Sequence, residues 1–393
     1  MRRASGPTGG SKAPLPVAAL GEAERLACLR LIRTENVGPV TFRELINHCG
    51  GAEKAIAALP DLSRRGGRRL PVQVYPRDKA EAELEAARKI GARALFTIEP
   101  GYPTALAHAG VPPPMIYVKG RTELLAGPAV AIVGARNASA AGRAMARQLA
   151  AGIGAAGIVV VSGLARGIDG VAHEATLATG TIAVLAGGID HIYPPEHEKL
   201  HAEIATQGCL VSEQPPGFKA RGNDFPRRNR IVSGLSLGVV VVEAATRSGS
   251  LITARRAADQ GREVFAVPGH PLDPRAEGTN MLLKQGATLV TSAGDVLEHL
   301  RPQMGLAPRG MEAGGASILE PMPAEDADLP SSLPHEAAQL VVLQALGPAP
   351  VSIDELARAT GLAVRALRGV LLELALAGRI EQQGAQLVAL KPD

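Results

Sequence analysis

The chain has 393 residues, of which 46% are apolar, so it holds enough apolar material for two or three globular domains. This composition excludes an intrinsically disordered or collagen-like chain. The net charge of +4 and the isoelectric point of about 9.1 are only mildly basic, so total charge alone identifies no partner.

The region 14–95 is predicted to form a helical domain. Apolar residues recur at helical spacing over 22–34, and the break Asn36-Val37-Gly38-Pro39 precedes further helices over 41–48 and 78–90. Helix, glycine turn and helix outline a helix-hairpin-helix, which either presents backbone N–H groups to DNA phosphates or serves only as a packing unit. The residues leave both interpretations open. The first residues lack the apolar core of a signal peptide and are expected to form a frayed tail.

The region 96–300 is predicted to be an α/β domain. Short apolar runs alternate with helical segments, which is typical of a parallel sheet covered by helices on both faces. This pattern predicts a Rossmann-like, doubly wound domain, entered through an extended Pro-rich stretch at 111–114. The predicted strands are 129–133, 158–161, 181–186, 210–211, 238–242, 263–267 and 288–290.

The C-terminal region is predicted to be a flexible linker over 301–334, rich in Pro, Gly, Ala and Ser, followed by a winged helix over 335–393. Its helices are expected over 336–346, 353–360 and 364–377, with Ser352 as the N-cap of the second and a strand over 386–390. The third helix offers only Arg365 and Arg368 for DNA. A protein-interaction role is therefore as well supported as duplex binding.

Two glycine-containing turns follow the first two strands, at Gly134–Arg136 and at Ser162–Asp169. In a doubly wound domain ligands bind at the carboxyl ends of the strands, where the next helix offers N–H groups to an anion. We therefore expect phosphate to bind there, with a forked donor from arginine, and we interpret Asp169 as a helix N-cap. The residues expected to contact phosphate from these turns are Gly134, Arg136, Ser162, Gly163 and Gly167.

Basic residues gather over 219–262, where nine lysines and arginines face three acidic residues. The block Phe225–Arg230 places an aromatic ring beside several of these charges. Arginine binds phosphate in a bidentate manner, and an aromatic ring can stack on a base. Ser248-Gly249 opens another helix after a strand, and Lys199 and His201 lie on the helix after 181–186, from which they are expected to reach a phosphate. The contacts expected from this part of the chain are Lys199, Phe225, Arg227, Asn229, Arg230, Ser248 and Gly249.

No metal, cofactor or catalytic set is expected. His191 and His197 lack a third ligand at a usable spacing, and the three cysteines are too far apart for a metal site or a disulfide framework, which favours a reduced, cytoplasmic chain. There is no Gly-Lys pair, which excludes a P-loop. The G-x-G-x-x-G at 152–157 lies between a helix and a strand and is interpreted as a helix terminator. No apolar run reaches membrane-spanning length.

Six motifs taken together resemble those of one bacterial family. They lie at Gly134–Arg136, Ser162–Asp169, Tyr193–Pro194, Ser212–Gly217, Phe225–Arg230 and Val267–Gly269. The motifs that begin at Ser162 and Phe225 are the most specific. The chain resembles the DNA-processing protein A family (DprA, or Smf) from about residue 101 to 300. The flanking units fit as well, because many relatives carry a sterile-alpha-motif-like N-terminal domain and a C-terminal winged helix.

The resemblance implies sequence-independent binding of single-stranded DNA and loading of RecA recombinase in natural transformation. It also implies a homodimer, a single-strand-binding protein as a further partner, and no catalysis. Arg136 is implied to bind phosphate, and Ser162, Gly163, Arg227, Asn229 and Arg230 to line the pocket. Relatives often have a lysine after Tyr-Pro, where this chain has Pro195, and Lys199 is expected to substitute for it.

Two other functions remain open on the residues alone. The first is a nucleotide-binding hydrolase of the lysine-decarboxylase-like phosphoribohydrolase type, which shares the predicted topology, with Glu243 as its acid and with its glycine block split between 268–270 and 278–280. The second is a duplex-DNA regulator that uses the winged helix.

Overall fold

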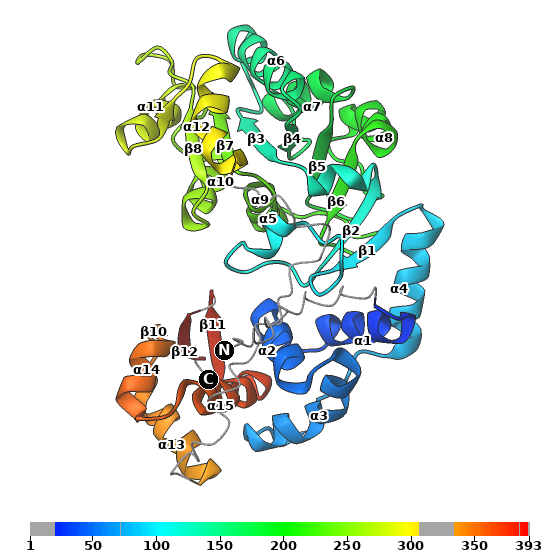
Figure 1. Cartoon of the computed structure of the whole chain (residues 1–393), viewed down its shortest axis with the longest axis vertical. Helices are drawn as coiled ribbons and strands as arrows, with labels where there is room; N and C mark the ends of the chain where they lie inside the picture. Colours follow the sequence, from blue (N-terminus) through cyan, green and yellow to red (C-terminus); the bar gives the residue numbers. More distant parts are fainter. Residues whose placement is uncertain (1–19, 71, 306–333, 385, 392–393) are drawn as a thin grey trace, which may run out of the picture.

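The computed structural model describes residues 20–70, 72–305, 334–384 and 386–391, and the expected frayed tail and most of the expected linker lie outside these ranges. Three units follow one another along the chain (Figure 1): a helical unit, a large α/β unit and a small C-terminal unit.

The N-terminal unit is helical, as predicted, up to residue 89. The hairpin between its first two helices ends at a proline in the first position of α2, where the missing N–H has no partner to lose. Leu29, Leu45 and Leu59 are fully buried and form the centre of its core. The helices are α1 (Glu22–Arg33), α2 (Pro39–Cys49), α3 (Ala52–Arg65) and α4 (Arg77–Lys89).

The central unit contains a nine-stranded sheet of order β1-β2-β6-β5-β4-β3-β7-β8-β9. The seven predicted strands are present and run parallel. Two antiparallel strands that were not predicted extend one edge of this sheet, and one of them lies at 93–96, which overlaps the region 14–95 that was expected to be helical. The strands are β1 (Arg93–Phe96), β2 (Met115–Gly120), β3 (Ala129–Gly134), β4 (Val159–Ser162), β5 (Thr181–Leu185), β6 (Cys209–Ser212), β7 (Gly238–Val242), β8 (Glu263–Ala266) and β9 (Thr288–Leu289).

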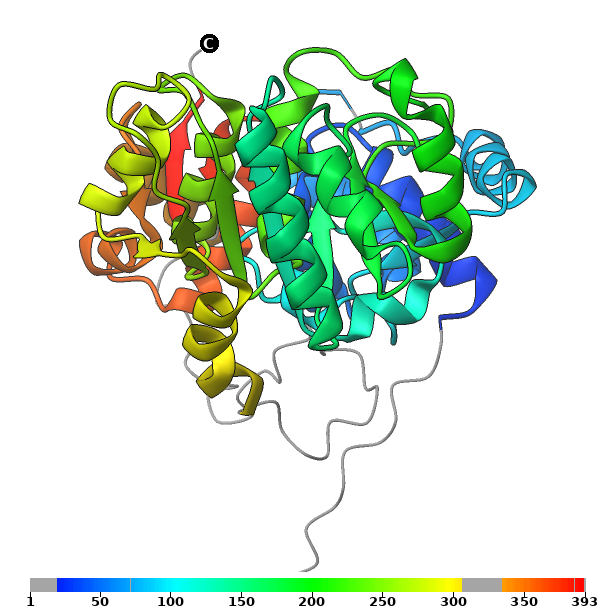
Figure 2. The same cartoon turned by 90° about the horizontal axis from the view of Figure 1, so that it is seen from above.

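Helices cover both faces of this sheet, as the continuous apolar strands require (Figure 2). On one face α6, α7 and α12 pack on Val130, Val160 and Val240, and on the other α5, α9 and α10 pack on Val161 and Val239. The helices are α5 (Thr104–Ala107), α6 (Ala140–Ala155), α7 (Ile168–Thr176), α8 (Glu198–Gln207), α9 (Asp224–Gly234), α10 (Gly249–Asp259), α11 (Glu277–Lys284) and α12 (Ala293–Gly305), with short 3-10 turns η1 (Thr122–Ala126) and η2 (Pro195–His197).

One helix boundary differs from its prediction, and another agrees with it. The helix α12 continues through Pro302 to Gly305, so the expected start of the linker at residue 301 is wrong. The G-x-G-x-x-G at 152–157 does mark the end of a helix, since α6 stops at Ala155 and Gly157 follows with a φ of 80°.

The C-terminal unit has the predicted winged-helix outline. Ser352 accepts a hydrogen bond from the N–H of Glu355 at 3.2 Å, which confirms the predicted N-cap. Its three strands pair antiparallel in the order β10-β12-β11. The elements are α13 (His335–Ala345), β10 (Val351–Ser352), α14 (Ile353–Thr360), α15 (Val364–Leu376), β11 (Ile380–Gln383) and β12 (Leu387–Leu390).

The helix α15 carries apolar residues on two faces. Leu367, Val370 and Leu374 face the core of the winged helix, whereas Leu372 and Leu376 belong to the core of the N-terminal unit. The third helix of a winged helix normally lies in the major groove. Here the C-terminal half of that helix is packed against α2 and α3, so the two terminal units form one joint body (Figure 1).

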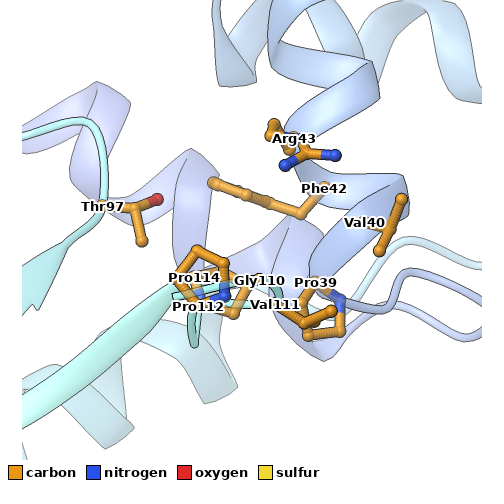
Figure 3. A pocket seen from close by; sticks show the side chains of 9 residues that line it. All are labelled: Pro39, Val40, Phe42, Arg43, Thr97, Gly110, Val111, Pro112 and Pro114. Carbon is orange, nitrogen blue, oxygen red and sulfur yellow. The ribbon is translucent and has the colours of Figure 1, made fainter. Parts of the chain in front are cut away.

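The hairpin before α2 lies in the same contact. The Nδ2 atom of Asn36 donates to the carbonyl of Leu376 at 3.3 Å, and the hairpin lines one wall of a cleft of about 470 Å³ whose other wall is β11 and Lys391. On its other side α2 meets the Pro-rich stretch 110–114 around a cavity of only about 10 Å³, the size of one water molecule (Figure 3). The hairpin therefore contributes to the packing between the two terminal units and also lines the larger cleft.

Candidate nucleic-acid interface

The carboxyl ends of the parallel strands bring the predicted motifs together. Close backbone approach explains two of the glycines there: a Cβ atom on Gly134 would lie 1.9 Å from the carbonyl oxygen of Val242, and one on Gly167 would lie 2.2 Å from that of Ala135. These glycines hold neighbouring loops against each other. The structure thus gives them a packing role, where the sequence suggested that they make room for phosphate.

The guanidinium of Arg136 lies over the ring of Phe225, with its carbon 5.4 Å from the ring centre. The ring of Tyr193 is tilted against the same phenylalanine at a centroid distance of 5.2 Å. Arg136 and Tyr193 are exposed, and Phe225 is half-buried. We call these three residues the Arg136–Phe225–Tyr193 cluster. It joins the loops after β3 and β5 to the first turn of α9, which are far apart in the sequence.

The loop after β4 is held from below by Asp169. This residue is not the helix N-cap that was predicted, because Gly167 occupies that position and Asp169 lies in the first turn of α7. Its carboxylate accepts the backbone N–H groups of Gly163 and Ala165 at 3.1 and 3.3 Å. Burial raises the pKa of Asp169, and the charge of Arg228 and these hydrogen bonds oppose that shift.

Arg228 fills the space above Gly163, where a Cβ atom would lie 2.1 Å from its guanidinium. The side chain is buried and donates to the carbonyl of Val184, while its Nε has no hydrogen-bond partner among the described residues. Burial lowers the pKa of Arg228 to about 10, with Asp169 acting in the opposite direction. The buried Arg228 and Asp169 therefore set the shape of the β4 loop from inside.

Two predicted contacts are not available to a ligand. The hydroxyl of Ser162 is fully buried and donates to the carbonyl of Ile132 at 2.6 Å. His201 is also buried and is bonded through Nε2 to the carbonyl of Ile189 at 3.1 Å, which excludes the expected reach to phosphate. Both expectations are wrong for the same reason: the polar atom satisfies a buried backbone group.

The arginines of the α9 block divide by environment. Arg230 is mostly buried, donates to Glu213 at 2.6 Å and to the carbonyl of Val111 at 3.0 Å, and so ties α9 to its surroundings. Arg227 is 57% exposed and lies 3.5 Å from Glu213. Asn229 donates to the carbonyl of Gly249 at 3.3 Å and joins α9 to α10. Of this block, Arg227 presents its charge to solvent.

The remaining predicted residues lie around the same edge. The side chain of Lys199, near the start of α8, is 89% exposed and lies 3.7 Å from Glu203. Ser248 caps α10 through a hydrogen bond from Ser250, and Gly249 is exposed with open space where a side chain would be. Arg166 extends from the β4 loop, 58% exposed, and pairs with Glu196 at 2.8 Å.

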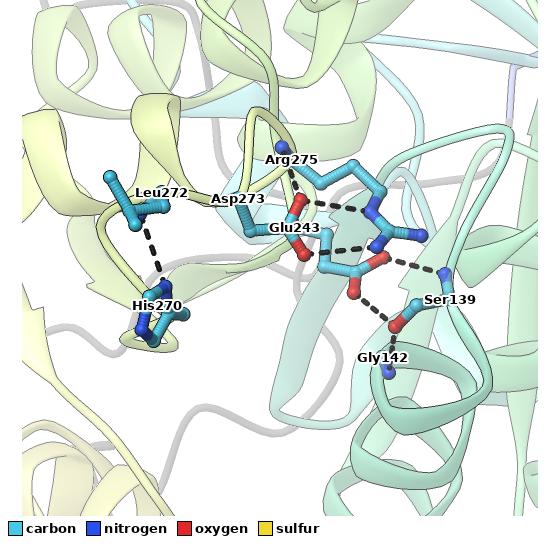
Figure 4. A network of polar contacts seen from close by, with 7 residues as sticks. All are labelled: Ser139, Gly142, Glu243, His270, Leu272, Asp273 and Arg275. Atoms are coloured by element: carbon cyan, nitrogen blue, oxygen red, sulfur yellow. Dashed lines mark hydrogen bonds and ion pairs between the residues drawn. The ribbon is translucent and has the colours of Figure 1, made fainter.

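The α6 N-terminus is not free, contrary to the prediction. The carboxylate of Glu243, from the end of β7, accepts the backbone N–H of Ser139 at 2.9 Å and also the hydroxyl of that serine (Figure 4). Ser139 in turn caps the helix by accepting from Gly142 at 2.9 Å. Glu243, cast above as the acid of a hydrolase, is thus occupied by its two hydrogen bonds to the N-cap serine of α6.

Sequence reasoning missed Tyr193, Glu213, Arg228 and Glu243 as parts of this region. Tyr193 and Arg228 stood inside recognised motifs, and Glu213 follows a strand directly, which is a usable signal in a doubly wound domain. Within the described ranges no cluster of His, Cys, Asp and Glu could hold a metal ion, and no helix there is long and apolar enough to cross a membrane.

Comparison with known proteins agrees with the motifs. A family model described as DNA recombination-mediator protein A matches residues 93–301, which is 209 of the 393 residues. The chain belongs to the DNA processing protein A family. A DprA-like N-terminal HHH domain matches residues 22–86 and a DprA winged helix domain matches residues 322–386, so the family's flanking units are present too.

Several members of the DNA processing protein A family are similar to this chain over most of their length. Protein Smf of Escherichia coli is 40% identical over 71% of this chain and 72% of its own, and DNA processing protein DprA of Bacillus subtilis is 46% identical over 58% and 77%. The X-ray structure of the Streptococcus pneumoniae DprA superposes with a TM-score of 0.61 at 33% identity, covering 70% of this chain and 96% of that one.

A second solved relative, DNA processing protein A of Helicobacter pylori, has a TM-score of 0.50 at 32% identity and covers 54% of this chain and 96% of its own. That structure is described as giving insight into the unique single-stranded DNA binding mode of the H. pylori protein. Together with the occupied Glu243, membership of this family does not favour the hydrolase alternative.

Proposed function

We propose that this protein binds single-stranded DNA without sequence preference at the carboxyl edge of its central sheet. The observation that carries the proposal is the Arg136–Phe225–Tyr193 cluster, in which an exposed guanidinium lies over one aromatic ring and a second ring is tilted against the first. A cation next to aromatic rings fits a strand whose phosphates need charge and whose bases need a face to stack on. The binding mode described for the H. pylori relative supports the same class of ligand.

The solvent exposure of each side chain indicates which part of the DNA it contacts. Arg136, Arg227 and Lys199 present charges to solvent at this edge and take the phosphates, while Tyr193 and Phe225 offer ring faces to bases. Every base has a stacking face, so this arrangement does not read sequence. Phosphate binding releases counterions from the strand, and affinity therefore falls as salt rises.

Arg230, Ser162 and Gly163 act from beneath the surface. Their partners are Glu213, the Ile132 carbonyl and the Asp169 carboxylate, so they position the loops that carry the exposed groups. No bond-breaking step is assigned to these residues: the function is binding. The winged helix is not assigned to duplex DNA, since the C-terminal half of α15 is packed against the N-terminal unit.

We also propose the cellular role that the family resemblance implies. The protein loads RecA recombinase onto the bound strand in the cytoplasm during natural transformation, acts as a homodimer, and meets strands coated with single-strand-binding protein. The support for this part is membership of a family described as recombination mediators. RecA nucleation on coated single strands, followed with and without the protein, tests it directly.

The first experiment is fluorescence anisotropy of a labelled single-stranded oligonucleotide at several salt concentrations. Wild type and Arg136→Ala are compared with Arg77→Ala, which removes a 72% exposed arginine from α4 in the N-terminal unit. Salt-sensitive binding that weakens with Arg136→Ala and is unchanged with Arg77→Ala is expected. Equal binding by all three proteins, or a preference for duplex, would overturn the proposed site.

A further inference from the structure

The turn between β3 and α6 is where a doubly wound domain normally binds the phosphates of a nucleotide. The helix that follows, α6, runs for 16 residues from Ala140, and its first N–H groups and positive dipole end face the carboxyl edge of the sheet. Free nucleotides would bind here if the turn were open.

In this protein the turn is filled from inside. One carboxylate oxygen of Glu243 accepts the N–H of Ser139, and the other accepts its hydroxyl (Figure 4). A Cβ atom on Gly142 would lie 2.4 Å from the carboxyl carbon, so the glycine in the first turn of α6 makes room for this carboxylate. The carboxylate holds the position in which a bound phosphate would receive the same donors.

The backbone of Glu243 supports this arrangement. Its φ is 54°, a left-handed conformation that residues other than glycine rarely adopt. The next residue, Ala244, is fixed on both sides: its N–H donates to the carbonyl of Arg275 at 2.6 Å, and its carbonyl accepts from Gly278 at 2.7 Å. Such a conformation persists where the surroundings determine it fully, and here it aims the carboxylate at α6.

An arginine near this turn is already paired with another carboxylate. The guanidinium of Arg275 is held by Asp273 through two hydrogen bonds of 3.0 and 2.9 Å, and it also feels the charge of Glu243 (Figure 4). A phosphate that entered the turn would have to replace the Glu243 carboxylate at the Ser139 donors. It would then lie next to that carboxylate. Two negative charges at that distance repel strongly.

We propose that Glu243 is a specificity residue that excludes free phosphate and mononucleotides from the β3–α6 turn. Phosphate then binds only to exposed side chains such as that of Arg136. This residue belongs to the same turn, and its guanidinium lies over the ring of Phe225. A polynucleotide can satisfy several such weak contacts along its backbone, whereas a mononucleotide cannot. This inference deepens the proposed binding of single-stranded DNA and rests on it for its biological meaning.

Glu243→Ala and Glu243→Gln in the full-length protein test the inference, with inorganic phosphate as the probe. Glu263→Gln is the matched control, because Glu263 also carries two polar contacts, to His299 and Gln303. Binding is measured by calorimetry and by the thermal shift with added phosphate at constant ionic strength. The alanine variant should bind phosphate at least about tenfold more tightly than wild type, the size of one charge interaction at a partly buried helix terminus.

Glu243→Gln keeps the size of the side chain and removes its charge, so it should show a smaller gain, and Glu263→Gln none. Folded Glu243 variants that bind phosphate no better than wild type would overturn the inference, and the glutamine variant decides if the alanine variant does not fold. Binding of single-stranded DNA by the wild type is measured in parallel. If the wild type did not bind single-stranded DNA, the proposed function would be wrong. The phosphate measurement would still test the role of Glu243.

Discussion

A Cβ atom on Gly66 would lie only 2.0 Å from the carbonyl oxygen of Glu373. The end of α3 in the N-terminal unit and the helix α15 of the winged helix thus touch backbone to backbone. The side chain of Glu373 is buried at this contact, where it pairs with His335 at 2.7 Å and accepts from Gln339 at 2.8 Å. The contact therefore depends on the absence of a side chain at residue 66.

Gly66→Ala should loosen the winged helix from the N-terminal unit. Gly66 has a φ of −66°, which alanine adopts without strain, so the added methyl group acts only through its clash with Glu373. Overpacking of this kind costs about 1–3 kcal/mol. Urea unfolding and limited proteolysis should show lower stability and faster cleavage near the joint. Gly38→Ala, where a Cβ would have no neighbour within 4 Å, is the control; equal behaviour of the two variants would contradict the clash.

Arg228 and Asp169 should behave as a coupled buried pair. Arg228→Met leaves the Asp169 carboxylate buried without its compensating charge, which should cost about 3–5 kcal/mol of unfolding free energy. The double variant with Asp169→Asn should recover part of that loss, although a neutral amide oxygen accepts more weakly than the carboxylate from the N–H groups of the loop. A double-mutant cycle measures the coupling. Additive losses would show that the two residues act independently.

Acid should destabilise the protein partly through His173. Burial lowers the pKa of His173 to about 3, whereas the unfolded side chain titrates near 6.5. The unfolded state therefore binds more protons between these values, and stability is complete above pH 6.5 and is lost as pH falls toward 3, by up to about 1.4 kcal/mol per pH unit. His173→Gln should flatten the pH dependence of the unfolding free energy in this window. An unchanged slope would mean that other groups control acid sensitivity.

Phe225 and Arg136 should affect DNA binding in different ways. Phe225→Leu removes a stacking face and should weaken single-strand binding by about 1–3 kcal/mol with little change in its salt dependence. Arg136→Ala removes one phosphate contact and should lower the slope of log affinity against log salt by about 0.7. Phe225→Tyr keeps the ring and serves as the control. If Phe225→Leu changed only the salt slope, the stacking role would be wrong.

The sequence by itself determined the fold class and the edge at which ligands meet it. Apolar strands such as 238–242 can be recognised in the sequence because a parallel sheet that is buried on both faces needs uninterrupted apolar residues. The carboxyl ends of such strands lie at one edge of the sheet, where ligands bind. The motif residues Arg136 and Phe225 were found in this way. The antiparallel strands at 93–96 and 115–120 were not, because such short strands carry too little periodicity to be recognised.

Only the tertiary structure decided which polar groups face solvent. The sequence gives no sign that separates two sets of polar residues in these motifs. Backbone carbonyls and Glu213 bind the side chains of Ser162, Arg228 and Arg230, whereas the side chains of Arg136 and Arg227 are exposed to solvent. Glu243 filling the α6 N-terminus and α15 packing on the N-terminal unit join residues more than 100 positions apart. Pairings at such distances follow from the packing of whole elements, and no local pattern in the chain records them.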